Sequence, residues 1–369
     1  MRIGIITLHY NLNYGALLQA YALQKALAKL GHEVDIINYV DPNGYTSMKI
    51  FGGSLIDKAR AMLFLGKRLK RRKAFKQFIR QDLSLSGEML RDSEQVNAEN
   101  LPYDLYITGS DQTFNLHLQG GGEYRKTYFL PLIKDRKISY ASSMGDLFSN
   151  YDEEEKRWLY DQLKQYQILS VREEAAADFI HSLGLERPHV DLDPTLLIDS
   201  DAWADFAKET KYEPGSYILF YSVLSAPWIV RNVEKLSKQT GLPVVAPHLM
   251  NRFEMKSGFI RAEECGPKEF VSLIKNAAMV CTSSFHGTAF AIQFKKKFLS
   301  FSLSKRGRIA NILKKLHLEK CIVTEDDEVM SCADRLAELD FTQAEAFLQS
   351  EREKSTEYIT EAIKETCEK

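Results

Sequence analysis

The stretch RIGIITLHYNLNYGALLQAYALQKALAKLGHEVDIINY, which spans residues 2–39, decides the fold. It opens with an apolar run at residues 2–8 and a polar turn at residues 9–14, and apolar residues then recur every three or four positions as far as Leu30. This spacing predicts a helix with one buried face, and Gly31 stands where a helix end favours a left-handed residue. Residues 33–39 form a second apolar run, so the stretch predicts a strand–helix–strand unit.

The same alternation of apolar run, polar turn and helical periodicity continues along the chain. Further strands are predicted at residues 103–108, 138–141, 168–171, 217–223, 243–246, 279–282 and 298–301. Such alternation is typical of α/β proteins, in which helices cover both faces of a parallel sheet. A chain of 369 residues is long enough for two such domains. We predict domains at residues 1–198 and 199–340, followed by a helix at residues 341–369 that packs across them.

The composition is that of a globular enzyme, with 44% hydrophobic and 27% charged residues. The formal net charge of -1 provides no general attraction for nucleic acid, so no nucleic-acid partner is expected. An anionic ligand would have to be held by a local cluster of Lys or Arg.

Cysteine usage and hydropathy predict a cytoplasmic protein. The five cysteines are odd in number and lack the paired spacing of metal or redox sites, so they are expected to be reduced thiols. No apolar run approaches the roughly 18 residues that a membrane-spanning helix needs. The residues after Met1 enter a strand pattern directly instead of forming a signal peptide.

Chemistry on a parallel sheet is expected beyond the carboxyl ends of its strands, and the most informative turn there is TSSFHGT, residues 282–288. It enters a helical pattern, so backbone amides and the helix dipole would favour an anion. Ser283 and Ser284 add hydroxyl groups, Gly287 allows close approach, and His286 can exchange a proton near neutral pH. The simpler interpretation is a serine N-cap followed by a histidine that packs in the core.

Two other turns carry charged side chains that suit catalysis. Ser110 and Asp111 follow the strand at 103–108, where a carboxylate can act as a base or bind a sugar hydroxyl, although Asp at such a place often only caps a turn. Arg172 follows the strand at 168–171 and can clamp a carboxylate or phosphate, although a plain ion pair with Glu173 is equally simple.

Neither a cofactor nor a metal is predicted. The turn at residues 9–15 lacks the spaced glycines of the dinucleotide fingerprint, so a nicotinamide or flavin site is not expected there. Asp191 and Asp193 resemble the metal-binding Asp-x-Asp of some glycosyltransferases, but Pro194 follows directly and favours a structural turn.

Residues 67–80 carry eight basic residues interleaved with apolar ones. A basic amphipathic helix can lie on an anionic membrane surface, which would make the protein peripheral to the inner face of a membrane. The alternative is a solvated helix face.

Six turns taken together, in this order, resemble the polysaccharide pyruvyl transferase family: residues 13–16, 109–112, 140–143, 170–173, 193–197 and 284–287. The resemblance implies two Rossmann-like domains facing a cleft, similar to the B-type glycosyltransferase fold. It also implies transfer of pyruvate from phosphoenolpyruvate to a sugar as a cyclic ketal. Phosphoenolpyruvate would be a substrate, and a lipid-linked sugar acceptor would suit a membrane contact of residues 67–80.

The resemblance also assigns roles to individual residues. The donor would be held by Arg172 and by the segment containing His286. We expect His286 to protonate the donor or assist phosphate departure, Asp111 to accept a proton from the acceptor, and Arg172 to stabilise the phosphate. Further substrate contacts are expected from Asn13, Tyr14, Gly15, Ser110, Ser283, Ser284, Phe285, Gly287, Arg306 and Arg308.

The sequence departs from the family pattern at Ser284. Several members have Arg-Leu-His where this chain has Ser284-Phe285-His286, so one cation facing the anionic donor is missing. The candidates to replace it are Lys305, Arg306 and Arg308, which follow the strand at 298–301.

Two alternative functions remain compatible with the sequence. One is a nucleotide-sugar glycosyltransferase of the same fold, although we identify no slot for a nucleotide base. The other is a catalytically silent protein that binds a sugar or an anion and has lost donor charge at Ser284.

Overall fold

The computed structural model describes residues 1–48, 65–118, 122–146, 148–224, 226–249, 252–305 and 307–367. The chain divides into two compact units, the first made of Met1–Gly52, Lys76–Ile198 and Ser350–Lys369 and the second of Gly53–Phe75 and Asp199–Gln349. Each unit is described by itself. The division differs from the expected one at helix α4 (Leu65–Gln81), whose first part belongs to the second unit because Lys67 and Arg71 bond to residues there.

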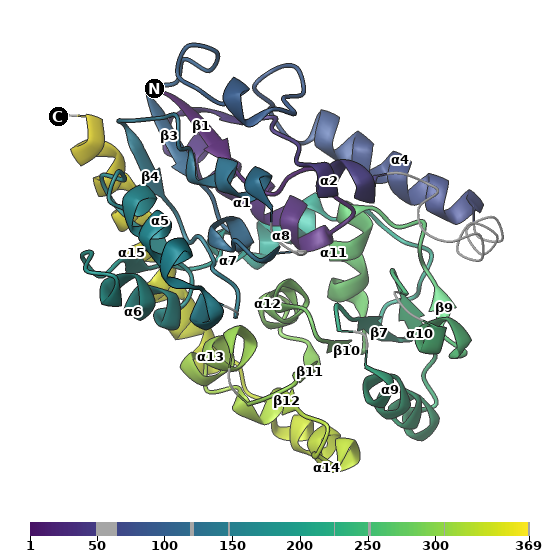
Figure 1. Ribbon diagram of the computed structural model, residues 1–369. Coiled ribbons are helices and arrows are strands. Elements are labelled where there is room, and N and C mark those ends of the chain that lie inside the picture. Colours follow the sequence, from purple (N-terminus) through teal and green to yellow (C-terminus); the bar gives the residue numbers. More distant parts are fainter. Residues whose placement is uncertain are drawn as a thin grey trace. The chain divides into compact units, whose positions relative to one another are not determined.

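The first unit is built on a parallel sheet of order β2-β1-β3-β4. Isolated bridges join β4 to β5, which pairs with β6. The strands are β1 (Arg2–Ile6), β2 (Glu33–Ile36), β3 (Leu105–Thr108), β4 (Lys137–Ser139), β5 (Ser170–Val171) and β6 (His189–Val190). The helices are α1 (Tyr14–Lys29), α2 (Pro42–Ser47), α5 (Glu153–Leu163), α6 (Glu174–Ser182) and α7 (Pro194–Leu197), with short 3-10 turns between them (Figure 1).

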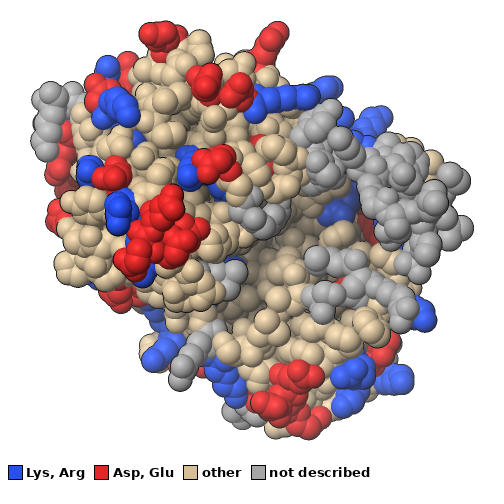
Figure 2. Space-filling view, in the orientation of Figure 1, with Lys and Arg blue, Asp and Glu red and all other residues tan. Residues whose placement is uncertain are grey.

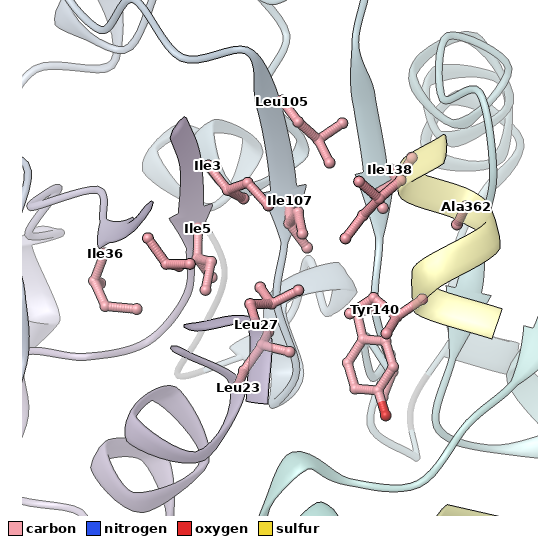
Figure 3. Close-up of a cluster of buried hydrophobic side chains, with 14 of the residues drawn as sticks. Ile3, Ile5, Leu23, Leu27, Ile36, Leu105, Ile107, Ile138, Tyr140 and Ala362 are labelled. Carbon is pink, nitrogen blue, oxygen red and sulfur yellow. The ribbon is translucent and has the colours of Figure 1, made fainter. Parts of the chain in front are cut away.

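The core of the first unit lies between its strands and two helices that are far apart in sequence. Figure 3 shows Leu23 and Leu27 of α1 near Ile5 and Ile107 of the central strands. Ala362 of α15 (Thr342–Cys367) packs beside β4 in the same cluster. The residues that give the opening stretch its apolar periodicity are therefore residues of the core.

The second unit contains a six-stranded parallel sheet of order β12-β11-β10-β7-β8-β9. Its strands are β7 (Ile218–Tyr221), β8 (Val244–Ala246), β9 (Ile260–Arg261), β10 (Met279–Thr282), β11 (Lys297–Phe301) and β12 (Ile322–Val323). Its helices are α8 (Ser200–Phe206), α9 (Pro227–Thr240), α10 (Arg252–Lys256), α11 (Pro267–Asn276), α12 (Phe285–Gln293), α13 (Arg308–Lys315) and α14 (Val329–Asp334). Both units are Rossmann-like, which confirms the predicted α/β class.

Three cysteines of the second unit, Cys265, Cys281 and Cys321, are free and buried. Burial raises the pKa of each thiol to about 12, so these side chains are protonated at neutral pH. No helix in the described ranges has the length and apolar character needed to cross a membrane.

The final part of α15 is fastened to the first unit by polar contacts. Arg352 donates from Nε to the carbonyl of Leu196 at 2.6 Å, and the His189 ring stacks on Tyr358 with centroids 4.5 Å apart. His189 Nδ1 lies 2.9 Å from a carboxylate oxygen of buried Asp191. This hydrogen bond raises the pKa of His189, against the opposing effect of partial burial.

This contact predicts a pH-dependent contribution to stability. Because the folded pKa of His189 is raised above 6.5, its stabilising effect should be complete below that pH and lost as the pH rises through the raised value. We expect His189→Gln to destabilise the first unit by about 0.5 kcal/mol at pH 5.5, a value limited by solvent screening, and by less at pH 8.5. Urea unfolding at both pH values measures the effect, with His181→Gln as control. A difference from wild type that does not change with pH would contradict the prediction.

Candidate functional site

The carboxyl ends of β3, β4, β5 and β6 are joined by a buried polar network in the first unit. Ser110 Oγ donates to Asp193 at 3.3 Å and to the carbonyl of Ala141 at 2.8 Å. Ser143 Oγ donates to Glu173 at 2.7 Å. Four turns that are separate in sequence therefore meet at one edge of the sheet, as expected for parallel strands.

Arg172 is the centre of this network. Its Nε donates to Glu173 at 3.0 Å and its NH1 to Asp193 at 2.7 Å, and all three side chains are at least nine-tenths buried. Burial by itself would lower the pKa of Arg172, but the charges of Glu173, Asp193 and Asp111 raise it overall. Among the described residues, Arg172 thus faces three carboxylates. Arg172, which we expected to bind an anionic substrate, already forms ion pairs with carboxylates of its own chain.

Asp111 is held in an unusual backbone conformation. Its φ is 66°, a left-handed value that non-glycine residues seldom adopt. Its Oδ1 accepts from the backbone N–H of Gln112 at 2.8 Å, and its carbonyl accepts from Ser143 N at 2.8 Å. Ala141, in the adjoining turn, also has a positive φ, of 46°. Strain of this kind at two adjacent strand ends often marks a functional site.

The N-terminal turn has a structural role in the described geometry. Asn13 caps α1, with its Oδ1 accepting from Gly15 N at 3.0 Å and Ala16 N at 3.3 Å. Tyr14 is fully buried. The Asp-x-Asp segment is also used internally, because Asp191 accepts hydrogen bonds from Ser170 and His189. In the described part of the chain, no three His, Cys, Asp or Glu side chains gather so as to hold a metal ion.

Hydroxyl groups dominate the carboxyl edge of the sheet in the second unit. Ser283, directly after β10, accepts from the backbone N–H groups of Val223 and Leu224 at 2.9 and 3.1 Å. Its Oγ also lies 2.9 Å from that of Ser222, which follows β7. Thr282 donates to the carbonyl of Tyr221 at 2.6 Å and accepts from Ser284 N at 3.0 Å. These bonds fix the turn that leads into α12.

The residues around His286 occupy the first turn of α12. Ser284 is the N-cap of α12 and accepts from Gly287 N at 3.4 Å. A serine N-cap was the simpler interpretation of this turn in the sequence. The His286 ring is buried and meets the edge of the Phe285 ring, with centroids 5.4 Å apart. A Cβ on Gly287 would overlap the side chain of Thr282. The glycine is therefore required by packing inside the protein, whether or not a ligand approaches.

The candidate replacement cations lie beyond β11. Lys305 forms an exposed ion pair with Asp327 at 3.0 Å, so its charge is partly balanced. Arg308 is the first residue of α13 and is partly buried. Arg306 lies outside the described residues.

A basic group at the end of β8 was not anticipated from the sequence. Arg71 of α4 donates from NH1 to His248 Nδ1 at 2.8 Å. Burial, followed by the charges of Arg71 and Arg68, lowers the pKa of His248 to about 3, so this imidazole is neutral. The only sequence signal was the density of basic residues in α4, because nothing local connects residue 71 with residue 248.

The two sheets and their polar edges define a class of protein with two Rossmann-like units, as in the B-type glycosyltransferase fold. The sequence profile of the polysaccharide pyruvyl transferase family matches residues 13–305, and the chain belongs to this family. The finding confirms the resemblance seen in the turns. No curated protein sequence matches the chain.

Solved structures of similar fold include UDP-N-acetylglucosamine 2-epimerases. The enzyme from Rickettsia bellii has a TM-score of 0.57 at 10% identity, with 100% of this chain and 97% of that chain covered. The enzyme from Neisseria meningitidis, solved with UDP-GlcNAc, has a TM-score of 0.54 at 11% identity, with coverage of 99% and 100%. At these identities the likeness establishes the fold alone.

The packing of Gly287 against Thr282 predicts a large effect from one methyl group. We expect Gly287→Ala to destabilise the second unit by about 1–3 kcal/mol, as overpacking generally does. The added loss should be smaller in a Thr282→Ala background, where the opposing atoms are absent. Thermal unfolding of the four proteins of this double-mutant cycle measures the coupling. Equal losses in both backgrounds would show that another contact is responsible.

The buried position of Arg172 predicts that its removal is costly. Arg172→Met leaves Glu173 and Asp193 buried without their cation, which should cost about 3–5 kcal/mol. Arg187→Met is the matched control, because the pairs of Arg187 with Glu174 and Asp178 are exposed and should be worth less than about 1 kcal/mol. Urea unfolding compares the variants, and similar losses would contradict the prediction.

Proposed function

We propose that this protein transfers pyruvate from phosphoenolpyruvate to two hydroxyls of a sugar in a polysaccharide or its precursor, in the cytoplasm. The observation that carries the proposal is the family match, which includes the His286 turn at the carboxyl edge of the second sheet. The donor is a substrate, and the proposal involves no cofactor or metal.

The reaction requires proton transfers and an anionic leaving group. The methylene carbon of phosphoenolpyruvate gains a proton, and a sugar hydroxyl adds to the neighbouring carbon and loses its own proton. The carbon–oxygen bond to phosphate then breaks, and phosphate leaves with the bonding electrons. A second hydroxyl adds to the same carbon and loses its proton, which ends on the released phosphate, and the ketal closes. The catalyst therefore needs an acid, a base, and groups that bind the donor.

We assign the donor to the second unit. His286 supplies the proton to carbon or to the departing phosphate, because an imidazole can give and take protons near neutral pH. The amides of the first turn of α12 favour the anionic donor. Arg308 and Lys305 are our candidates for the charge that an arginine at position 284 would have supplied.

We assign the acceptor to the first unit. Asp111 receives the proton of the attacking hydroxyl, and its strained backbone fixes the position of its carboxylate. The carboxylates of Glu173, Asp193 and Asp111 beside Arg172 suit hydroxyl groups and the developing positive charge on the reacting carbon. In this proposal Arg172 is a positioning residue that holds Glu173 and Asp193 and balances Asp111.

The proposal predicts which variants lose activity while remaining folded. His286→Gln and Asp111→Asn should each lower pyruvyl transfer about 10²–10⁴-fold, as loss of a general acid or base does. His317→Asn, which changes an exposed histidine of the second unit, should keep the wild-type rate. Phosphate release from phosphoenolpyruvate with a panel of sugar acceptors is the readout. Near-native rates in both site variants would overturn the assignment.

Ligand-induced thermal stabilisation separates this proposal from its alternatives. Phosphoenolpyruvate should stabilise the wild-type protein, and stabilisation by UDP-sugars alone would favour a nucleotide-sugar enzyme. Binding of phosphoenolpyruvate without phosphate release across the acceptor panel would favour a silent binding protein.

A further inference from the structure

Helix α4 has an unbalanced charge that the proposed reaction does not use. It contains eight of the 49 basic residues of the chain and none of the 50 acidic residues, so the rest of the protein is net acidic. Figure 2 shows Lys and Arg side chains at the upper right of the molecule, where α4 lies in Figure 1. Some lysines in other helices have acidic partners three residues away, as Lys156 has Glu153 and Lys354 has Glu351.

The apolar side of α4 is used inside the fold. Phe75, Phe78 and Ile79 are at most 3% exposed, and Arg71 on the same side is buried against His248. An amphipathic helix that lies in a membrane interface must bury its apolar face in lipid. Helix α4 has no such face to offer, so any membrane contact has to be electrostatic.

The opposite side of α4 is an exposed basic stripe, which consists of Leu69, Lys70, Lys73, Gln77 and Arg80. Leu69, Lys73, Gln77 and Arg80 follow one another at three- or four-residue spacing, and Lys70 lies three residues before Lys73, so these positions share one helix face. Leu69 is 43% exposed, an unusual position for a large apolar side chain. The stripe covers eleven helical steps, or about 16 Å, which is far longer than one phosphate group.

Six cations of this helix have no acidic partner among the described residues. Within the described ranges, Arg68, Lys70, Arg72, Lys73, Lys76 and Arg80 form no ion pair, whereas Lys67 pairs with Glu264 at 3.7 Å. Like charges at three- and four-residue spacing repel one another, so the helix is destabilised until an external anion balances it. The structure thus holds several unbalanced cations along one exposed line.

We propose that the basic stripe of α4 binds the anionic headgroups of a lipid bilayer. A bilayer presents many negative charges in a plane, which matches a straight stripe that one helix can present alone. The exposed Leu69 suits the headgroup region. Nucleic acid fits less well, because the net acidic remainder of the chain would repel a polyanion that wraps around the protein.

Vesicle flotation tests this inference. Wild-type protein should float with vesicles containing 30% phosphatidylglycerol at low salt and remain unbound to pure phosphatidylcholine vesicles, with binding lost at high salt because exposed charges are screened. The variant Lys70→Glu/Lys73→Glu/Arg80→Glu should bind at least on the order of 100-fold more weakly, from roughly fivefold per basic residue.

The matched control reverses three exposed basic residues on another helix, Arg231, Lys235 and Lys238 of α9, and so changes the net charge equally. Binding close to wild type in this control supports a local site. Equal loss in both triple variants, absence of binding at low salt, or preferential binding of wild-type protein to a DNA oligonucleotide would each overturn the inference. The stripe is separate from the proposed site, so phosphoenolpyruvate binding by the α4 variant should remain, and the two proposals fail independently.

Discussion

A buried ion-pair network centred on Arg172 holds the first unit together at the carboxyl edge of its sheet. Arg172 follows β5, Asp193 follows β6, Ser110 follows β3, and Ser143 follows β4, so one set of side chains ties four strand ends. A buried guanidinium without partners would cost several kilocalories per mole, and so would the carboxylates without it. Each member therefore stabilises the fold only when the others are present, which fixes the relative positions of the turns.

The two sheet edges differ in the side chains that line them. In the first unit, the described residues at this edge place the carboxylates of Glu173, Asp193 and Asp111 beside Arg172. In the second unit the turn after β10 is built from neutral hydroxyl groups and backbone amides, with His286 in the first turn of a helix. The assignment of donor and acceptor to different units follows from this difference in charge.

Much of the architecture and of the candidate site was accessible from sequence. The apolar runs and helical spacing predicted both parallel sheets because burial on a sheet face and on one helix face leaves a period in the sequence. The order of the six turns predicted the family, since each turn follows a strand whose position the pattern already gave. The N-cap at Ser284 was also open to prediction, because it depends on residues only three apart.

The sequence by itself determined the fold class, the family and the turns that carry the candidate site residues, because these depend on local periodicity and on residue order. Only the tertiary structure decided how the charges are paired. In the folded chain, Arg172 pairs with Glu173 and Asp193. Thr282 leaves no room for a Cβ at Gly287. Arg71 contacts His248, which is 177 residues away in the sequence. Such pairings depend on distances through space, and a linear sequence carries no signal for them unless the partners are close along the chain.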